Sequence, residues 1–383
     1  MAKTTGRAGH YAMQPEGYRT YVPRPLPPNP PIDFDSSMLS ILSQADRNLG
    51  RLSGATVTLP NPDLFVFMYI RKEAVLSSQI EGTQSSLIDL LEFEAGARLR
   101  GHPRDVVDVS NYIDAMNHGL GQIARGRELS VALVQEIHAR LLSRGRGSSH
   151  NPGELRAVQN WIGPPGKRIE GAAFVPPAVP EMRKALDDLE RFLLKERSLP
   201  PLVKVGLAHS QFETIHPFLD GNGRMGRLLI TFLLTAEGYL ERPLLYLSHY
   251  FRQNRSSYYD TLQAVRDEGD WEGWLRFFLK GVDEVSRQAT ETAKRIIQLR
   301  EEHRRLIQNA MGRRAGGALI LIEFMYQHPM VSVNDMQRVT GLSFPSANEL
   351  AVELEGLALL NEQTGNRRNR VFAYRPYLDI ILD

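Results

Sequence analysis

Apolar residues recur three and four positions apart through most of this 383-residue chain, and no other feature constrains its fold as strongly. This spacing places them on one face of an α-helix, where they can be buried together. A first helix is expected from Ser36 or Ser37, and a second from about Asn61 to Gly82. The pattern therefore predicts a mainly α-helical protein. Further helices are expected over residues 84–97, 105–124, 129–143, 180–198, 202–216, 224–238, 255–267 and 271–309, the last of them kinked.

Three segments depart from this pattern. Residues 1–35 are rich in proline, which disfavours helix and sheet interior and predicts an extended N-terminal arm. Between Gln159 and Val175 the turn-rich sequence GPPGKRIEG separates two short apolar runs, which predicts a small β-hairpin. After Gly317 the pattern of short helices followed by an alternating segment predicts a winged helix over residues 317–383. Its helices are expected at Ala318–Gln327, Val333–Thr340 and Ser346–Leu357, and its strand segment at Arg367–Tyr374.

The composition excludes some kinds of catalytic and metal site but does not indicate which molecules the protein binds. The chain has no cysteine, which excludes disulfides, thiolate metal sites and a cysteine nucleophile. Any metal ligand must therefore supply oxygen or nitrogen. A formal charge of +2, with 23% charged residues, identifies no partner. Since no apolar run approaches membrane-spanning length and the start lacks the apolar stretch of a secretory signal, we expect a cytoplasmic protein with no membrane partner.

A glycine-rich loop between two predicted helices carries the most informative residues. Pro217 disfavours helix at the residue before it, which places His216 at a helix exit. The glycines of LDGNGRMGR let the backbone approach a ligand closely, and the asparagine between them tolerates left-handed geometry. A new helix is expected from about Arg224. Because its first amides are unpaired and lie at the positive end of the helix dipole, the loop is a competent phosphate cradle.

Charged side chains complete this interpretation. Arg224 and Arg227 are three residues apart and can bind the same anion. Asp220 supplies the hard oxygen ligand that Mg²⁺ prefers beside phosphate. His216 can remove the proton of an attacking hydroxyl while the cation and the donors stabilise charge on phosphorus. These residue types together predict phosphoryl or nucleotidyl transfer.

The run HPFLDGNGRMGR, residues 216–227, resembles the signature of the Fic family at every position that defines it. The resemblance implies a protein adenylyltransferase that binds ATP with Mg²⁺ and transfers AMP to a Ser, Thr or Tyr hydroxyl of a target protein or of itself. His216 would be the base and Phe218 a buried anchor. The residues implied to bind nucleotide are Asp220, Gly221, Asn222, Gly223, Arg224, Gly226 and Arg227, with Asp220 as the Mg²⁺ ligand.

A second run, SSQIEG at residues 77–82, fits the inhibitory motif of the same family. By this resemblance Glu81, flanked by Ser77 and Gly82, would pair with Arg227 and occupy the place of the ATP γ-phosphate. One arginine cannot serve a carboxylate and a phosphate equally, and a second anion repels the nucleotide. The resemblance therefore implies an enzyme restrained by Glu81.

The resemblance extends beyond these two motifs. The predicted hairpin looks like the family's flap, which pairs with the backbone of the target, and Ile162, Gly163 and Pro164 could also touch nucleotide. Tyr258 and Tyr259 resemble a tyrosine pair that lines the adenosine pocket in relatives. Carried over to this chain, the organisation is a proline-rich arm at 1–35, a helical region with the inhibitory helix at 36–110, a Fic catalytic core at 111–290, a linker helix at 291–316 and a winged helix at 317–383.

Other enzymes remain open alternatives. His209, Glu213 and His216 are four and three residues apart, so one continuous helix could present them to a catalytic metal, as in a metal hydrolase. Pro217 and the phosphate loop argue against that reading. Relatives of the Fic family can also transfer other phosphate-containing groups, and some remove AMP, in which case Glu81 would position a water.

A regulator that binds DNA through its C-terminal segment is a further alternative. Arg367, Arg368 and Arg370 lie on the predicted wing, and Ser346 and Asn348 lie near the start of the predicted recognition helix. Acidic residues make that helix less suited to DNA, and docking of a protein or formation of a homodimer fits the segment equally well. The acidic residues are Glu349, Glu353 and Glu355.

Overall fold

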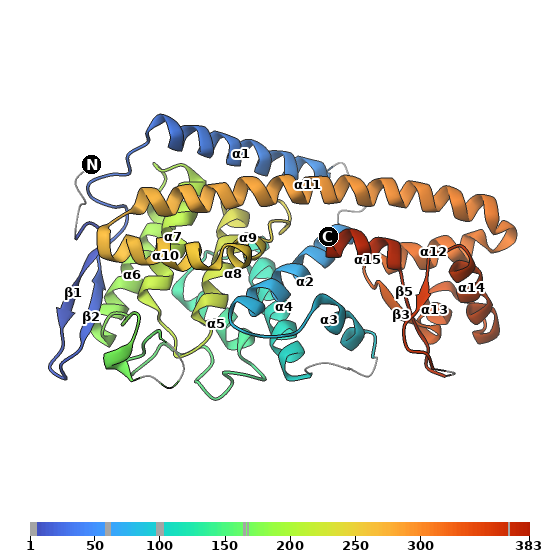
Figure 1. The fold of residues 1–383 in the computed structure, drawn as a ribbon, viewed down its shortest axis with the longest axis horizontal. Coiled ribbons are helices and arrows are strands. Elements are labelled where there is room, and N and C mark those ends of the chain that lie inside the picture. Colours follow the sequence, from blue (N-terminus) through green and yellow to red (C-terminus); the bar gives the residue numbers. More distant parts are fainter. Residues whose placement is uncertain (1–5, 58–62, 97–102, 164–165, 167, 367) are drawn as a thin grey trace.

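Helices dominate the structure, a computed structural model that describes residues 6–57, 63–96, 103–163, 166, 168–366 and 368–383 (Figure 1). The predicted mainly helical class is confirmed. The first eleven helices are α1 (Ser36–Val57), α2 (Asp63–Ile80), α3 (Leu87–Glu94), α4 (Pro103–Ala124), α5 (Val131–Leu141), α6 (Val179–Lys195), α7 (Pro201–Ile215), α8 (Asn222–Ala236), α9 (Ser248–Gln253), α10 (Arg255–Glu268) and α11 (Trp271–Ala310). Of these, α9 was not expected from the sequence.

Helices α7 and α8 lie at the centre of the molecule. Every residue of α7 from Leu202 to Ile215 is buried, and so are most residues of α8. A helix that exposes no face to solvent is typical of a core position. The loop that joins them, residues 216–221, therefore leaves and re-enters the core, and its side chains meet groups from several other helices.

Helix α11 is a 40-residue rod along the long axis of the molecule (Figure 1). Its N-terminal half packs against α1, and its C-terminal half continues to the C-terminal segment. The kink expected in this helix is absent, and the helix passes unbroken through residue 290, where the sequence suggested a boundary. Its buried residues recur at helical spacing from Trp271 to Ile296, so one face of this stretch is covered, and Ile307 is buried further along.

The N-terminal arm contains a hairpin that its prolines concealed. Strands β1 (Gly9–Met13) and β2 (Arg19–Pro23) pair antiparallel, with Tyr11 opposite Tyr21. Tyr21 is buried, its ring lies 5.9 Å from that of Phe174, and its amide donates to the carbonyl of Val175 at 2.9 Å. The expected extended arm therefore contains a β-hairpin that the sequence did not predict, because most of its prolines follow β2.

The C-terminal segment has the order of elements that the winged-helix interpretation requires. Helix α12, strand β3, helices α13 and α14, and strands β4 and β5 follow one another, and the antiparallel sheet has the order β3-β5-β4. Strands β3 and β4 and the final helix were not predicted. The elements are α12 (Ala315–Met325), β3 (Met330–Ser332), α13 (Val333–Thr340), α14 (Phe344–Gly356), β4 (Asn361–Glu362), β5 (Val371–Ala373) and α15 (Arg375–Leu382).

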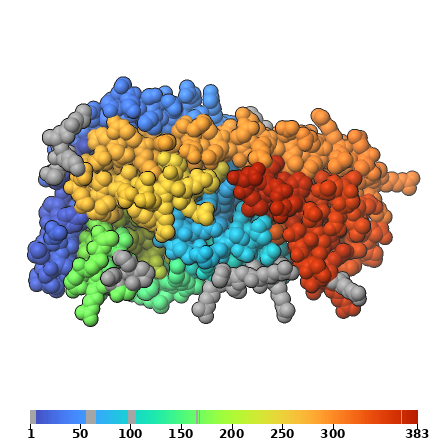
Figure 2. All heavy atoms as spheres, viewed as in Figure 1, coloured from blue at the N-terminus to red at the C-terminus, as the bar shows by residue number. Residues whose placement is uncertain are grey.

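This segment packs against the rest of the protein at one end of the molecule (Figure 2). Helix α15 contacts α11, and the ammonium group of Lys72 on α2 donates to the carbonyl of Ile381 at 2.8 Å. Helix α2, which leads to Glu81, therefore touches the C-terminal segment directly. In the part of the chain that the structure describes, no helix combines the length and apolar character needed to cross a membrane.

Candidate active site

His216 ends helix α7 in a left-handed conformation. Its φ is 50° and its ψ is 60°, and its amide donates to the carbonyl of Phe212 at 3.0 Å. A side chain with a Cβ atom pays a steric cost there, so surrounding contacts must hold it. Because the following residue is Pro217, the helix cannot simply continue. The strain turns the chain sharply and directs residues 216–221 back toward the start of α8.

Arg156 holds this turn. Its side chain is 1% exposed, its Nε donates to the carbonyl of His216 at 3.0 Å, and its Nη2 donates to the carbonyl of Pro177 at 2.5 Å. Its backbone amide donates to the carbonyl of Pro217 at 2.9 Å. Burial lowers the pKa of Arg156 to about 10, which leaves the group charged at neutral pH. The sequence did not single out Arg156, since a lone arginine between predicted helices carries no pattern.

Replacing Arg156 with methionine is expected to lower the free energy of unfolding by about 2–4 kcal/mol, because buried carbonyls lose a charged donor. The turn at His216 should also loosen, so the reaction that depends on His216 should slow at least about tenfold. Urea unfolding and an assay of the activity proposed below measure the two effects. Arg183→Met, at an exposed arginine on α6, is the matched control. Equal stability of the two variants would contradict the role given to Arg156.

A stacked pair anchors the middle of the loop. The rings of His138 and Phe218 lie 3.7 Å apart and nearly parallel, and Phe218 is fully buried, as the anchor prediction requires. The Nδ1 atom of His138 accepts from the amide of Gly153 at 2.9 Å, so its Nε2 carries the proton that bonds the carbonyl of Asp220 at 2.9 Å. Burial lowers the pKa of His138 to about 4, so the ring is neutral. This ring was not predicted as a site residue.

Asn222 closes the loop on itself. Its Oδ1 accepts from the amide of Phe218 at 2.9 Å, and its Nδ2 donates to the carbonyl of the same residue at 2.8 Å. Helix α8 begins at Asn222, two residues earlier than expected, and the residue with positive φ is Gly221, at 79°. Asn222 therefore serves through its side-chain amide and not through tolerance of left-handed backbone. The first amides of α8 face the end of the loop, as a phosphate cradle requires.

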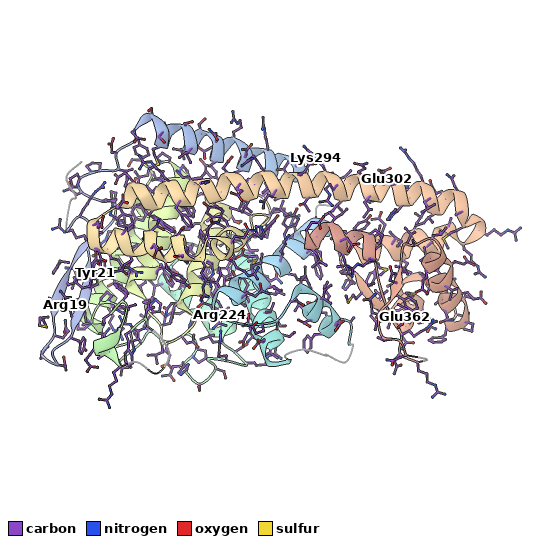
Figure 3. The ribbon with its side chains drawn as sticks, in the orientation of Figure 1. Arg19, Tyr21, Arg224, Lys294, Glu302 and Glu362 are labelled. Atoms are coloured by element: carbon purple, nitrogen blue, oxygen red, sulfur yellow. The ribbon has the colours of Figure 1, made fainter. Side chains whose placement is uncertain are left out.

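Arg224 is a buried cation without a full set of partners. It lies inside the helical body (Figure 3) and is 1% exposed. Its Nε and Nη1 have no hydrogen-bond acceptor among the described residues, and its Nη2 lies 3.7 Å from Oδ1 of Asp220. Buried charged donors are normally paired. The unsatisfied nitrogens beside the start of α8 therefore fit a ligand anion.

The guanidinium of Arg227 is hydrogen-bonded to residues near the C-terminal end of α2. Its Nε donates to Oγ of Ser77 at 2.8 Å, and its Nη2 donates to the carbonyl of Ser77 at 3.0 Å and to Oε1 of Glu81 at 2.6 Å. Burial alone would raise the pKa of Glu81, but Arg227 and, less strongly, Arg224 lower it below its ordinary value. The ion pair expected between Glu81 and Arg227 is present, and Glu81 is ionised at neutral pH.

Glu81 lies directly over the first turn of α8. A Cβ atom built on Gly223 would collide with Oε1 of Glu81, so the absence of a side chain there makes room for the carboxylate. Gly82 follows with a φ of 94°, which lets the chain turn away immediately after the glutamate. Arg146 donates to the carbonyl of Glu81 at 3.3 Å from the loop after α5. The carboxylate thus lies at the start of α8, where the predicted phosphate cradle would hold an anion.

The imidazole of His216 is uncharged at neutral pH. Burial lowers its pKa to about 4, and the nearby Arg266 charge adds to this effect. Its Nδ1 lies 3.4 Å from the carbonyl of Glu213, whereas Arg266 donates to the same carbonyl at 3.3 Å and to Oγ1 of Thr214 at 3.1 Å. A neutral imidazole can accept a proton, so these surroundings suit a general base.

Gly226 lies where α7 and α8 pack closely. A Cβ atom there would collide with the carboxylate of Glu213 and lie 3.3 Å from the ring of Phe212, both on α7. Its carbonyl also bonds Nδ1 of His209 at 2.9 Å. The residue therefore lets α7 and α8 approach each other, and its predicted place in the nucleotide site stays a prediction. Burial raises the pKa of Glu213 to about 7.

The two predicted tyrosines have different surroundings. Tyr258 is 1% exposed, its hydroxyl lies 2.9 Å from Nε2 of His209, and its ring stacks on Phe251 at 4.5 Å. It is a core residue, because aromatic rings at helical spacing are usually buried together. Tyr259 is 42% exposed, and the Glu81 and Arg227 charges both act on its pKa, so it is the member of the pair open to a ligand near the site.

The flap is smaller than the predicted hairpin. Ile162 and Phe174 form an antiparallel bridge, with amides of Ile162 and Ala173 donating at 2.8 Å, and a short 3₁₀ turn at Ile169–Gly171 lies between them. Asn160, just before it, donates to the carbonyl of Phe218 at 2.8 Å and so ties the flap to the loop. Gly163 lies beside this bridge, whereas Pro164 lies outside the described residues.

The geometry does not support the metal-hydrolase alternative. Both ring nitrogens of His209 are engaged, one by the carbonyl of Gly226 and the other by the hydroxyl of Tyr258. His216 lies beyond the end of α7 in left-handed backbone, so it does not continue the helical face of Glu213. Among the described residues, no group of three or more His, Cys, Asp or Glu side chains could hold a metal ion.

Two family models match the part of the chain that forms this site. Residues 39–121 match the Fic/DOC family N-terminal model, which covers α2 and Glu81, and residues 128–234 match the Fic/DOC family model, which covers the loop and most of α8. The site is therefore built from segments similar to this family.

Curated relatives are similar over part of the chain, and solved structures share its fold. The protein adenylyltransferase Fic of Drosophila melanogaster is 33% identical over 177 residues, and that of Drosophila ananassae 32% over 165. Each match covers 43% of this chain, and the chain spans about a third of the length of these relatives. A Fic family protein from Desulfovibrio desulfuricans G20 shares the fold with a TM-score of 0.58 at 20% identity, covering 90% of this chain and 97% of that one. Residues 134–508 of Fic-1 from C. elegans match with a TM-score of 0.51 at 21% identity, covering 67% and 74%.

Proposed function

We propose that this protein is an adenylyltransferase that transfers AMP from ATP to a hydroxyl of a protein. The observation that carries the proposal is the buried, partly unpaired Arg224 at the start of α8, a few residues from His216. An unsatisfied guanidinium beside free helix amides fits a polyphosphate, and a neutral histidine beside it fits proton removal from a hydroxyl. The names of the Drosophila relatives agree with this activity.

In the proposed reaction, the loop and α8 position ATP and His216 acts on the acceptor. The amides at the start of α8 and Arg224 hold the phosphates and stabilise charge that develops on the transferred group. The neutral imidazole of His216 takes the hydroxyl proton as the acceptor oxygen bonds to the α-phosphorus and pyrophosphate leaves. The flap at Ile162 is placed to pair with the backbone of the target.

Asp220 fits the role of a Mg²⁺ ligand. Its Oδ1 accepts from the amide of Gly221 at 2.6 Å, and its Oδ2 lies 3.7 Å from Nδ1 of His150. The carboxylate is partly exposed beside Arg224, at the edge of the phosphate cradle. Mg²⁺ bound here would join phosphate oxygens and neutralise charge on the leaving pyrophosphate.

Under the same proposal, Glu81 inhibits the transfer. Arg227 already donates to Glu81 and Ser77, so a terminal phosphate arriving at this arginine must displace the carboxylate. Two anions at one guanidinium repel each other in a buried site. ATP then binds in a pose that does not align the α-phosphorus with the acceptor. Release of Glu81 would free Arg227 for the nucleotide.

Mass spectrometry of a Glu81→Gly variant tests the activity. The variant is incubated with ATP, Mg²⁺ and a cell lysate, and acceptors should gain the mass of one AMP on Ser, Thr or Tyr. The adduct mass reports the group transferred, and the modified peptides report the targets. Adducts of another mass, or no adduct on any protein including the enzyme itself, would contradict AMP transfer.

The pH profile of kcat/KM should show a general base with an unusually low pKa. Since the pKa of His216 is lowered to about 4, kcat/KM of the Glu81→Gly variant should stay level from about pH 8 to about pH 5 and fall below it. The sign follows because the base must be neutral, which it is above its pKa. Removing the Glu81 charge lowers this pKa further. Circular dichroism at each pH controls for unfolding, and a midpoint near the ordinary histidine value would contradict the prediction.

A further inference from the structure

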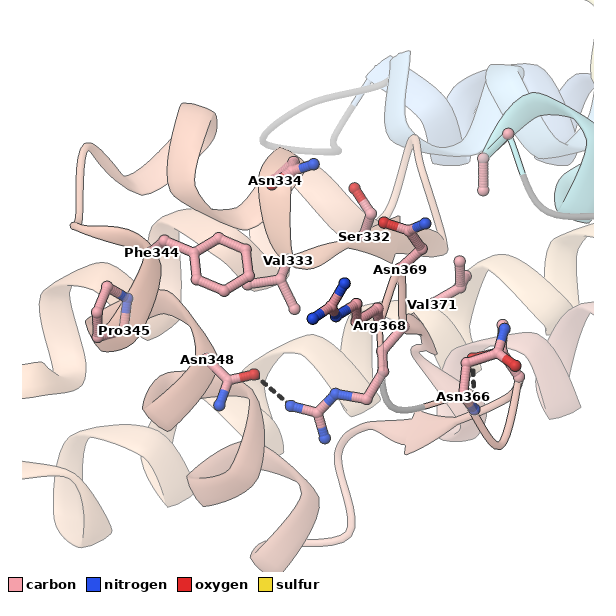
Figure 4. A pocket seen from close by; sticks show the side chains of 14 residues that line it. Ser332, Val333, Asn334, Phe344, Pro345, Asn348, Asn366, Arg368, Asn369 and Val371 are labelled. Atoms are coloured by element: carbon pink, nitrogen blue, oxygen red, sulfur yellow. Dashed lines mark hydrogen bonds between the residues drawn. The ribbon is translucent and has the colours of Figure 1, made fainter.

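A large groove lies in the C-terminal segment, away from the phosphate loop. It has a volume of about 1420 Å³ and opens between the start of α14, the wing that precedes β5 and the end of α3 (Figure 4). Side chains of Phe344 and Asn348 border it from α14, and Arg368 enters it from the wing. Arg370, also on the wing, lines it as well. None of these residues belongs to the adenylyltransferase site.

The lining has the chemistry of an anion-binding and base-reading surface. Of the described residues that line the groove, four are asparagines, two are arginines and none is acidic. Asparagine amides pair with base edges, and arginines bind both phosphates and guanine. The guanidinium of Arg370 donates to Oδ1 of Asn348 and thereby holds both side chains in the groove (Figure 4).

The acidic residues that made α14 look unsuited to DNA are directed elsewhere. Glu349 and Glu353 both pair with Arg314, the first at 2.7 Å. Glu355 accepts from the amide of Glu362 at 3.1 Å. None of the three lines the groove. The face of α14 toward the groove is therefore uncharged at Phe344 and Asn348 and is flanked by the basic wing.

We propose that this groove, formed by the start of α14 and the wing arginines, is a docking site for duplex DNA. In the related recognition geometry, the N-terminal residues of such a helix reach base edges while the wing contacts the backbone. Here Asn348 faces the bases, and Arg368 and Arg370 bind phosphates. Duplex DNA fits better than an acidic protein because the lining joins four asparagine amides to two arginines, a combination that can contact base edges as well as phosphates. The proposal is independent of AMP transfer.

Fluorescence anisotropy with a labelled random-sequence duplex of about 30 base pairs tests the groove, with the full chain titrated between about 50 and 200 mM salt. The parent should bind with an affinity that falls as salt rises. Arg368→Ala combined with Arg370→Ala should weaken binding at least about tenfold and reduce the salt slope by about 2, since each lost phosphate contact contributes about 0.9. The matched control is Arg313→Ala with Arg375→Ala, which removes the same charge from exposed positions outside the groove.

A second pair of variants keeps the fold. Asn348→Asp preserves the size of the side chain and its contact with Arg370 but places a negative charge in the groove, so binding should be lost. Asn361→Asp makes the same change at an exposed position on β4 and should bind as the parent does. The proposal is overturned if the parent shows no salt-dependent binding to duplex DNA, as expected of a segment that docks proteins, or if both groove variants bind as tightly as their controls.

Discussion

Glu81→Gly is expected to raise AMP incorporation by about ten- to hundredfold, the span that a charged hydrogen bond of about 1.5–3 kcal/mol represents. The substitution removes the carboxylate that bonds Arg227 at 2.6 Å and covers the first turn of α8. Arg227 then becomes available to the terminal phosphate of ATP. Self-modification with labelled ATP and Mg²⁺ measures the rate.

Two further variants distinguish loss of the Glu81 carboxylate from a nonspecific effect of introducing glycine. Glu81→Gln keeps the size of the side chain and removes its charge, so it should also activate, though less. Glu16→Gly removes an exposed glutamate from the turn between β1 and β2 and should leave the rate unchanged. A Glu81→Gly variant that is no faster than the parent would contradict inhibition by Glu81. It would not contradict AMP transfer, which the mass of the adduct tests separately.

His216→Ala in the Glu81→Gly background is expected to lower kcat by about 10²- to 10⁴-fold, the range for loss of a general base. The left-handed turn is held mainly by the backbone contacts of Arg156, so the loop should persist without the imidazole. ATP should therefore bind with an affinity within a few-fold of the background variant. Single-turnover kinetics with labelled ATP give the rate, and calorimetry gives the affinity.

The control for this experiment is His10→Ala, at an exposed histidine on β1. It should change neither the rate nor the affinity. A His216→Ala variant that keeps its kcat would show that the imidazole is not the base. A variant that loses ATP binding together with kcat would show that His216 acts by shaping the loop rather than by moving a proton.

Local sequence patterns predicted the helices because the formation of a helix depends on residues that are close together in the chain. The spacing of apolar residues located α7 and α8, and Pro217 identified the helix exit at His216. The same rules missed the β1–β2 hairpin, because its stability comes from Tyr21 packing on Phe174, more than 150 residues away. They also predicted a kink in α11, which instead runs as one straight helix from Trp271 to Ala310.

Long-range contacts decided what the site residues do. Asn222 was noticed for its backbone, but its side chain closes the loop on Phe218. Gly226 and Tyr258 are predicted to contact the nucleotide, and the structure adds that the core needs the first for helix packing and buries the second. Arg156 and His138 had no sequence signal, since a single arginine or histidine gains meaning only from the carbonyls that the fold brings to it.

The amino-acid sequence by itself determined the residue types at the phosphate loop, their order and the presence of a glutamate able to oppose them. Only the tertiary structure brought Glu81 onto Arg227 across 146 residues of chain, left Arg224 partly unpaired and turned the acidic residues of α14 away from the groove. The physical reason is that spacing along the chain reports local conformation, whereas charge pairing and burial depend on which distant groups share the same volume.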